Sequence, residues 1–151
     1  PLWQIPLLWA FFNGVQAAAG VPGGVLSDRI GRVPCVAMGW IVYVLAYIGF
    51  AFVSTPVAVY ALFGGYALFF ALTEGAQRAL VTDLVGETLR GRAFGIFHGS
   101  IGIAALPSSI LFGVLWNVYG ARTAFLFGAG LAAVATVGLF AARAALRADR
   151  T

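Results

Sequence analysis

From position 33 to position 73 the chain carries no charged side chain, and this stretch constrains the fold more than any other feature. It is about twice as long as the roughly 20 residues that one membrane-spanning helix needs. In the whole chain 62% of residues are hydrophobic and 9% are charged, against about 45–50% and about 25% in soluble domains. A domain of this size buries only about 70% of its surface. The sequence therefore excludes a water-soluble or disordered chain and predicts an integral membrane protein in a lipid bilayer.

Polar clusters and turn signals divide the apolar sequence into five segments. Charged residues separate segments near 28–32 and 84–92, and Ser54-Thr55-Pro56 breaks the longest apolar run as a turn would. The segments are continuous apolar runs, which predict helices rather than the alternating strands of a barrel. We therefore predict an all-α membrane protein with five transmembrane helices, at about 3–27, 33–53, 57–80, 93–116 and 123–142.

The arginines predict the orientation of these helices. With five spans, the loops at 28–32 and 84–92 share one side of the membrane with the C-terminal tail, and Arg122 is the arginine on the other side. Cytoplasmic loops carry the excess of basic residues. We expect a cell (inner) membrane protein with a cytoplasmic C-terminus, because one side holds Arg29, Arg32, Arg90, Arg92, Arg143, Arg147 and Arg150.

Two short segments resemble each other and predict an internal repeat. Residues 24–31 (GVLSDRIG) match residues 113–120 (GVLWNVYG) at five of eight positions when Asp and Asn are counted as alike. Each segment ends one span and turns into the next, on opposite sides of the membrane, as in the inverted repeats of secondary transporters. The alternative is a chance likeness of glycine-rich turns. By the repeat, a helix precedes the first span, so the chain is an incomplete six-helix bundle.

The first of these segments also resembles a family signature. Residues 24–32 (GVLSDRIGR) resemble the G-x-x-x-D-R-x-G-R-R signature of the major facilitator superfamily of transporters, with Val33 in place of the second basic residue. Residues 74–85 and 90–95 look like the region between the tenth and eleventh helices of bacterial members. The resemblance covers the chain and implies helices eight to twelve of a twelve-helix carrier. Its N-terminal bundle would then be a missing partner of the same chain.

Charged residues at the cytoplasmic ends of the helices are candidates for a gate. The resemblance implies that Asp28 bonds the free N–H groups of the helix that starts near Arg92, which suits the positive end of a helix dipole. Arg29 or Arg32 would then pair with an acidic residue at the end of the third span. The alternative is a set of ordinary interfacial charges. The expected gate consists of Gly24, Asp28, Arg29, Gly31, Arg32, Glu74, Arg78 and Asp83.

Polar residues inside the spans are candidates for the transport pathway. Glu74 and Arg78 share a helix face near the cytoplasmic edge, where a gate or structural pair is expected rather than a substrate ligand. Asn13 and Gln16 share a face of the first span near mid-membrane, and either line a substrate cavity or bond neighbouring helices. His98, the single histidine, either relays protons or bonds a backbone carbonyl.

The second and last spans are apolar all round, so we expect them to face lipid as outer support. The first, third and fourth spans carry the polar residues and should face the cavity.

These features favour secondary active transport of a small solute by alternating access, with proton-coupled efflux as one form of it. The alternative is a non-transporting membrane scaffold or receptor subunit. The chain shows no cluster of metal ligands, serine-centred motif or phosphate-binding loop. We therefore expect no enzyme activity, no cofactor, no metal and no nucleic-acid partner.

Overall fold

The computed structural model describes residues 3–148, apart from the side chains at 142, 143 and 145–148, and this range contains helices and no strand. The C-terminal arginines used in the topology argument therefore lie outside the described residues or side chains. The all-α fold class is confirmed. The helices are Gln4–Ile30 (α1), Arg32–Phe52 (α2), Pro56–Leu84 (α3), the short 3-10 helix Glu87–Leu89 (η1), Arg90–Tyr119 (α4) and Ala121–Ala148 (α5).

Four of these helices are long and apolar enough to cross a membrane, namely α2, α3, α4 together with η1, and residues Ala121–Ala141 of α5. α1 has 27 residues, which is sufficient length at about 1.5 Å per residue. α1 carries the amides Asn13 and Gln16 within its length. The membrane boundaries along the helices stay a prediction.

Glycines form the two tightest turns, which have the same geometry. Gly31 (φ 95°, ψ 155°) ends α1, and its amide donates to the carbonyl of Ser27 across 3.0 Å. Gly120 (φ 86°, ψ 165°) ends α4, and its amide donates to the carbonyl of Trp116, also across 3.0 Å. Both lie in the left-handed region, where a side chain would be strained.

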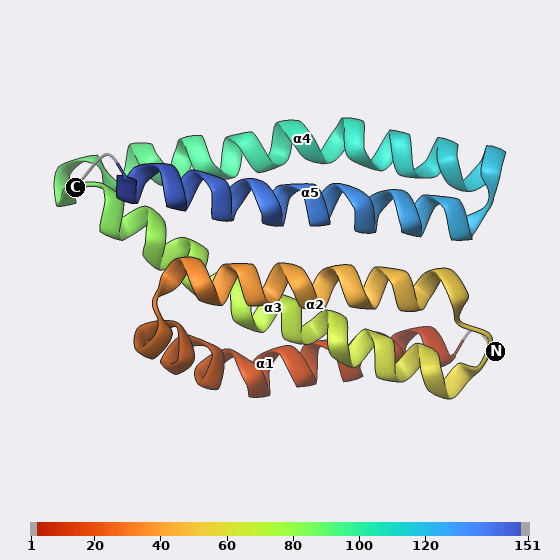
Figure 1. Ribbon diagram of the computed structural model, residues 1–151. Helices are drawn as coiled ribbons and strands as arrows, with labels where there is room; N and C mark the ends of the chain where they lie inside the picture. The colour runs from red at the N-terminus through yellow and green to blue at the C-terminus, as the bar shows by residue number, and fades with distance from the viewer. Residues whose placement is uncertain (1–2, 149–151) are drawn as a thin grey trace.

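The two turns occupy equivalent places in the predicted repeat and lie at opposite ends of the bundle (Figure 1). The pair α1–α2 therefore corresponds to the pair α4–α5 with its direction reversed. The next bond in each turn also agrees, since the amides of Cys35 and Ala124 each donate across 3.3 Å to the carbonyl of the turn glycine. The two turns therefore share their backbone geometry, as the repeat predicts, and the inverted repeat itself stays a prediction.

Small residues allow α3 to pack closely against α1 and α2. A Cβ atom at Gly23 would lie 2.4 Å from the carbonyl oxygen of Ala71, and one at Gly39 would lie 2.3 Å from Cγ2 of Thr73. Without a side chain at these positions the backbones approach each other, as is typical of helix contacts in membranes. The buried core beside this contact consists of Cys35, Val36 and Ala76.

α2 packs between two helices and keeps one apolar face exposed. It contacts α3 on one side and α5 on the other (Figure 1). Its small residues Cys35, Ala37 and Gly39 are buried, as is typical of close helix contacts in membranes. Its exposed apolar side chains follow a helical stripe of Met38, Ile41, Leu45, Ile48 and Phe52. The expectation that the second span faces lipid stays a prediction for this stripe.

Candidate functional site

Arg32 joins the ends of three helices. Its Nη1 atom pairs with Asp28 at the end of α1 and lies 3.3 Å from Oγ of Ser27, and its Nε atom lies 3.3 Å from Oδ2 of Asp83 on α3. The predicted contact between the signature loop and the end of the third span is therefore present. Both carboxylates are more than half exposed, so each pair contributes only about 0–1 kcal/mol.

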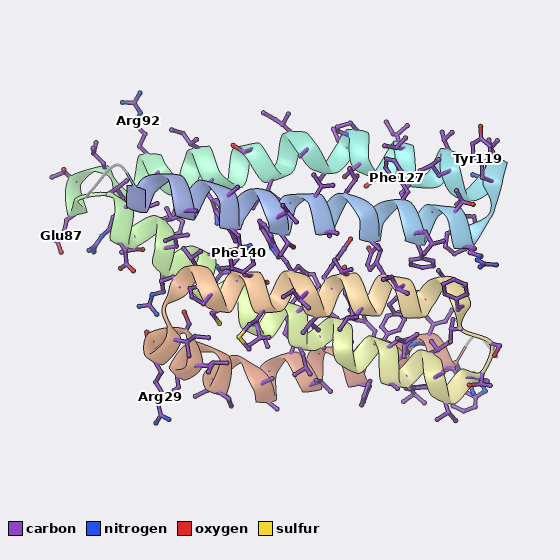
Figure 2. The ribbon with its side chains drawn as sticks, in the orientation of Figure 1. Arg29, Glu87, Arg92, Tyr119, Phe127 and Phe140 are labelled. Atoms are coloured by element: carbon purple, nitrogen blue, oxygen red, sulfur yellow. The ribbon has the colours of Figure 1, made fainter. Side chains whose placement is uncertain are left out.

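Of the two arginines expected to make this contact, Arg32 reaches Asp83, whereas Arg29 is exposed and points away from the bundle (Figure 2). One expectation for this cluster is wrong. Asp28 does not cap α4, because among the described residues its side chain bonds Arg32 and no amide at the start of α4. The nearby guanidinium of Arg32 occupies the Asp28 carboxylate instead.

Glu74 links α1 and α3 inside the helices. Its Oε2 atom accepts a hydrogen bond of 3.1 Å from Nε2 of Gln16, and its Oε1 atom pairs with Arg78 one turn further along α3. The pairing of Glu74 and Arg78 follows from their spacing. The bond to Gln16 does not, because the two residues lie 58 positions apart. The structure thus joins a residue expected in the cavity to a residue expected in the gate.

A cavity of about 510 Å³ opens between α1, α3 and α4 at this bond. Its volume lies within the range of about 300–1,000 Å³ that is usual for small-molecule sites. Polar and aromatic side chains from all three helices line it, including Trp9, Phe12, Asn13, Gln16, Tyr66, Phe69, Phe70, Thr73, Glu74, Gln77, Arg78, Phe97 and His98. All the polar span residues singled out in the sequence therefore meet at one cavity.

The amides and the histidine of this cavity differ in how they are held. Asn13 donates from Nδ2 to the carbonyl of Trp9 on its own helix, across 2.8 Å, so it does not bridge helices. His98 lies beside the rings of Phe94 and Phe97, with centroid distances of 6.2 and 5.1 Å. Of the two predicted amides, Gln16 is therefore the one that bridges to a second helix.

Sequence reasoning missed the aromatic wall of the cavity. Phe12 is only 5% exposed, and its ring centroid lies 5.2 Å from that of Trp9, 5.8 Å from that of Tyr66 and 5.7 Å from that of Phe70. The sequence spacing could have predicted this wall. Phe12 precedes Gln16 by four residues and Phe70 precedes Glu74 by four residues, which puts each ring one helical turn from a polar residue on the same face.

A second cavity, of about 690 Å³, lies between α2, α4 and α5. The described residues that line it are uncharged and include Tyr43, Tyr47, Ser108, Phe112 and Gly128. None of the described residues of α4 is buried. Part of the surface of this helix therefore faces the second cavity, and much of the rest is exposed.

Comparison with known proteins places the chain among transporters. Residues 4–150 match the model of the Major Facilitator Superfamily. The chain is 37% identical over 131 residues to the uncharacterized MFS-type transporter MJ1317 of Methanocaldococcus jannaschii, covering 86% of this chain and 33% of that protein. It is 26% identical over 136 residues to MJ1560 of the same organism, another uncharacterized MFS-type transporter, covering 89% and 35%. The chain thus spans about a third of the length of these curated relatives.

Proposed function

This chain belongs to the major facilitator superfamily, and from that premise we propose that it forms part of a secondary active transporter that moves a small solute by alternating access. The observation that carries the proposal is the bond between Gln16 and Glu74 at the wall of a solute-sized cavity. Polar and ionisable groups inside membrane helices are costly, and usually mark a transport pathway or an ion relay. Here they come together from three separate helices at one space.

The cluster around Arg32 would serve as the gate at the cytoplasmic side. It joins the ends of α1, α2 and α3 through exposed ion pairs, which are weak enough to open and close in each cycle. Holding these ends together would favour one of the two access states, and releasing them would favour the other. Gly24 and Gly31 lie beside the cluster.

Proton coupling and export are the finer part of this proposal. Glu74 and His98 line the same cavity, so a carboxylate and an imidazole are available to carry a proton past the solute. Export of the solute in exchange for protons that move inward down their gradient would use both groups. The protein would lie in the inner membrane with its C-terminus in the cytoplasm, and no enzymatic step is proposed.

The rest of the transporter would complete the bundle. The inverted repeat exchanges α1 with α4 and α2 with α5, so α3, which precedes α4, corresponds to a helix that precedes α1. Since α3 packs against α1 and α2, that helix would pack against α4 and α5, where the second cavity and the unburied face of α4 lie. A further N-terminal bundle would then close the pathway from the opposite side.

The full-length protein, reconstituted in vesicles that contain a pH-sensitive dye, tests the proposal. With an imposed solute gradient, we expect a solute-dependent proton flux for at least one member of a chemically varied panel, and its loss in Glu74→Gln. Glu87→Gln is the matched control, because Glu87 is 86% exposed and lines neither of the two cavities described above. Absence of flux for the whole panel would favour the alternative, a non-transporting scaffold or receptor subunit.

A further inference from the structure

The cavity between α1, α3 and α4 has a charge balance that restricts what it can hold. Glu74 and Arg78 are the charged residues among those that line it, and they pair with each other. With Glu74 ionised and His98 counted as neutral, as in the formal charge of the chain, the charges of the lining residues sum to zero. A solute with a net charge would leave one charge without a partner inside the membrane, where an uncompensated charge is costly.

The cavity is also divided into an aromatic layer and a polar layer. Phe12 and Phe70 belong to the aromatic layer, and Gln16 and Glu74 lie one helical turn further along the same two helices. One turn is about 5.4 Å, so the centre of a bound ring and the polar head of the same molecule would lie about one turn apart. Trp9 and Phe97 extend the aromatic layer along α1 and α4.

The polar layer can exchange partners with a head group. Glu74 now accepts from Gln16 at one oxygen and from Arg78 at the other. A head group with a donor can take the place of either partner at Glu74. Its own acceptor can then bond the amide or guanidinium that has been released, so that no buried polar group loses its partner.

Resting on the proposed function, we propose that this cavity binds an amphipathic organic solute of zero net charge, either uncharged or zwitterionic. Its aromatic body lies among Trp9, Phe12 and Phe97, and its head carries a donor and an acceptor that meet Glu74 and Gln16. The charge balance of the cavity predicts the net charge of the solute, and the cluster of aromatic rings predicts its aromatic body. The spacing of the two layers predicts the distance between that body and the polar head.

Four probes that share a phenyl ring and a three-carbon chain test this inference on the purified full-length transporter by titration calorimetry. They are 3-phenylpropanol (uncharged), L-phenylalanine (zwitterion), 3-phenylpropylamine (cation) and 3-phenylpropionate (anion). We expect both net-neutral probes to bind about tenfold more tightly than either ion. Trp9→Ala should weaken that binding about tenfold, because Trp9 lines the cavity and is 61% exposed, so its removal spares the core. Trp3→Ala, at a site 63% exposed, is the matched control and should bind as the unaltered protein does.

Tighter binding of the cation or the anion overturns the inference, as does the absence of binding by all four probes or equal binding by Trp9→Ala. The vesicle assay separates these results from failure of the proposed function. Flux of a charged solute that is lost in Trp9→Ala would leave transport standing and refute the zero net charge. Binding of the neutral probes without flux of any solute would leave the ligand class standing and refute transport.

Discussion

Gln16 on α1 and Glu74 on α3 are joined by a hydrogen bond of 3.1 Å between residues 58 positions apart in the chain. The bond connects α1 to the helix that carries the ion pair of Glu74 and Arg78. It also lies at the wall of the cavity that α4 completes.

Loss of the Gln16 amide should impair transport. A hydrogen bond to a charged group is worth about 1.5–3 kcal/mol, and losing 1–3 kcal/mol from one of two states shifts their equilibrium about 5- to 150-fold. We expect Gln16→Ala to lower the solute-dependent flux by at least about fivefold with membrane expression retained. Asn13→Ala is the control, because Asn13 bonds its own helix, and should keep most of the flux. Equal flux in the two variants would show that the hydrogen bond between Gln16 and Glu74 is not needed for transport.

Arg32 should control access from the cytoplasmic side. Arg32→Ala removes the pairs to both Asp28 and Asp83, so we expect greater labelling of cysteines introduced in the cavity from the cytoplasmic side, and slower turnover. Arg29→Ala removes a neighbouring charge that points into solvent (Figure 2) and should change neither. Asp28→Asn should change labelling and turnover in the same direction as Arg32→Ala, but less. It weakens one exposed ion pair, and such a pair contributes about 0.2–1 kcal/mol. If Arg29→Ala has the larger effect, the assignment of the gate to Arg32 fails.

Gly23 should be essential for the contact between α1 and α3. A methyl group at this position meets the carbonyl oxygen of Ala71 at 2.4 Å, and a backbone atom can move only if the helices separate. We expect Gly23→Ala to destabilise the protein by about 1–3 kcal/mol, measured as a lower melting temperature in detergent. At Gly65 a Cβ atom has nothing within 4 Å, so Gly65→Ala should be neutral or stabilise by up to about 1 kcal/mol. A higher melting temperature for Gly23→Ala would contradict the close packing.

The two turn glycines should be equally sensitive to substitution. Gly31 and Gly120 both have φ near +90° with ψ of 155° and 165°, a region that glycine alone adopts readily and that costs another residue about 1–3 kcal/mol. Gly31→Ala and Gly120→Ala should therefore lower the melting temperature by similar amounts. Gly113→Ala, at a helical position with open space around the added methyl group, is the control. A lower melting temperature for only one of the two variants would show that the two turns do not contribute equally to stability.

Cysteine labelling should report the topology. Cys35 is fully buried, so background labelling from this part of the chain should be low. A cysteine in place of Arg90 should be protected from an impermeant reagent added outside, and one in place of Arg122 should react. Arg122 lies over the ring of Phe52, 4.3 Å from its centroid, in the first turn of α5. The turn between α4 and α5 is at the end of the bundle opposite to the turn between α1 and α2 (Figure 1). The reverse labelling pattern would invert the membrane orientation and with it the proposed gate.

Much of the architecture could be predicted from the sequence because lipid imposes simple requirements. Uncharged stretches of about 20 residues can satisfy their backbone in a bilayer only as helices, and the breaks at 28–32, 54–56 and 84–92 agree with the observed helix ends. The glycines at 31 and 120 marked the turns, since only a residue without a side chain adopts that backbone freely. The pairing of Glu74 with Arg78 followed from a spacing of four residues on one helix.

The tertiary structure decided which of these local features meet. A helix sequence determines which residues share a face, but not which neighbour that face contacts. The meeting of Gln16 and Glu74, the choice of Arg32 over Arg29 for Asp83, and the place of α2 between α3 and α5 all depend on how the helices approach each other. That approach is set by Gly23 and Gly39, where missing side chains let backbones touch. The sequence by itself determined the helices, their turns and the family, because these depend on local chemistry and on the solvent. Only packing between distant segments could bring the polar residues to one cavity.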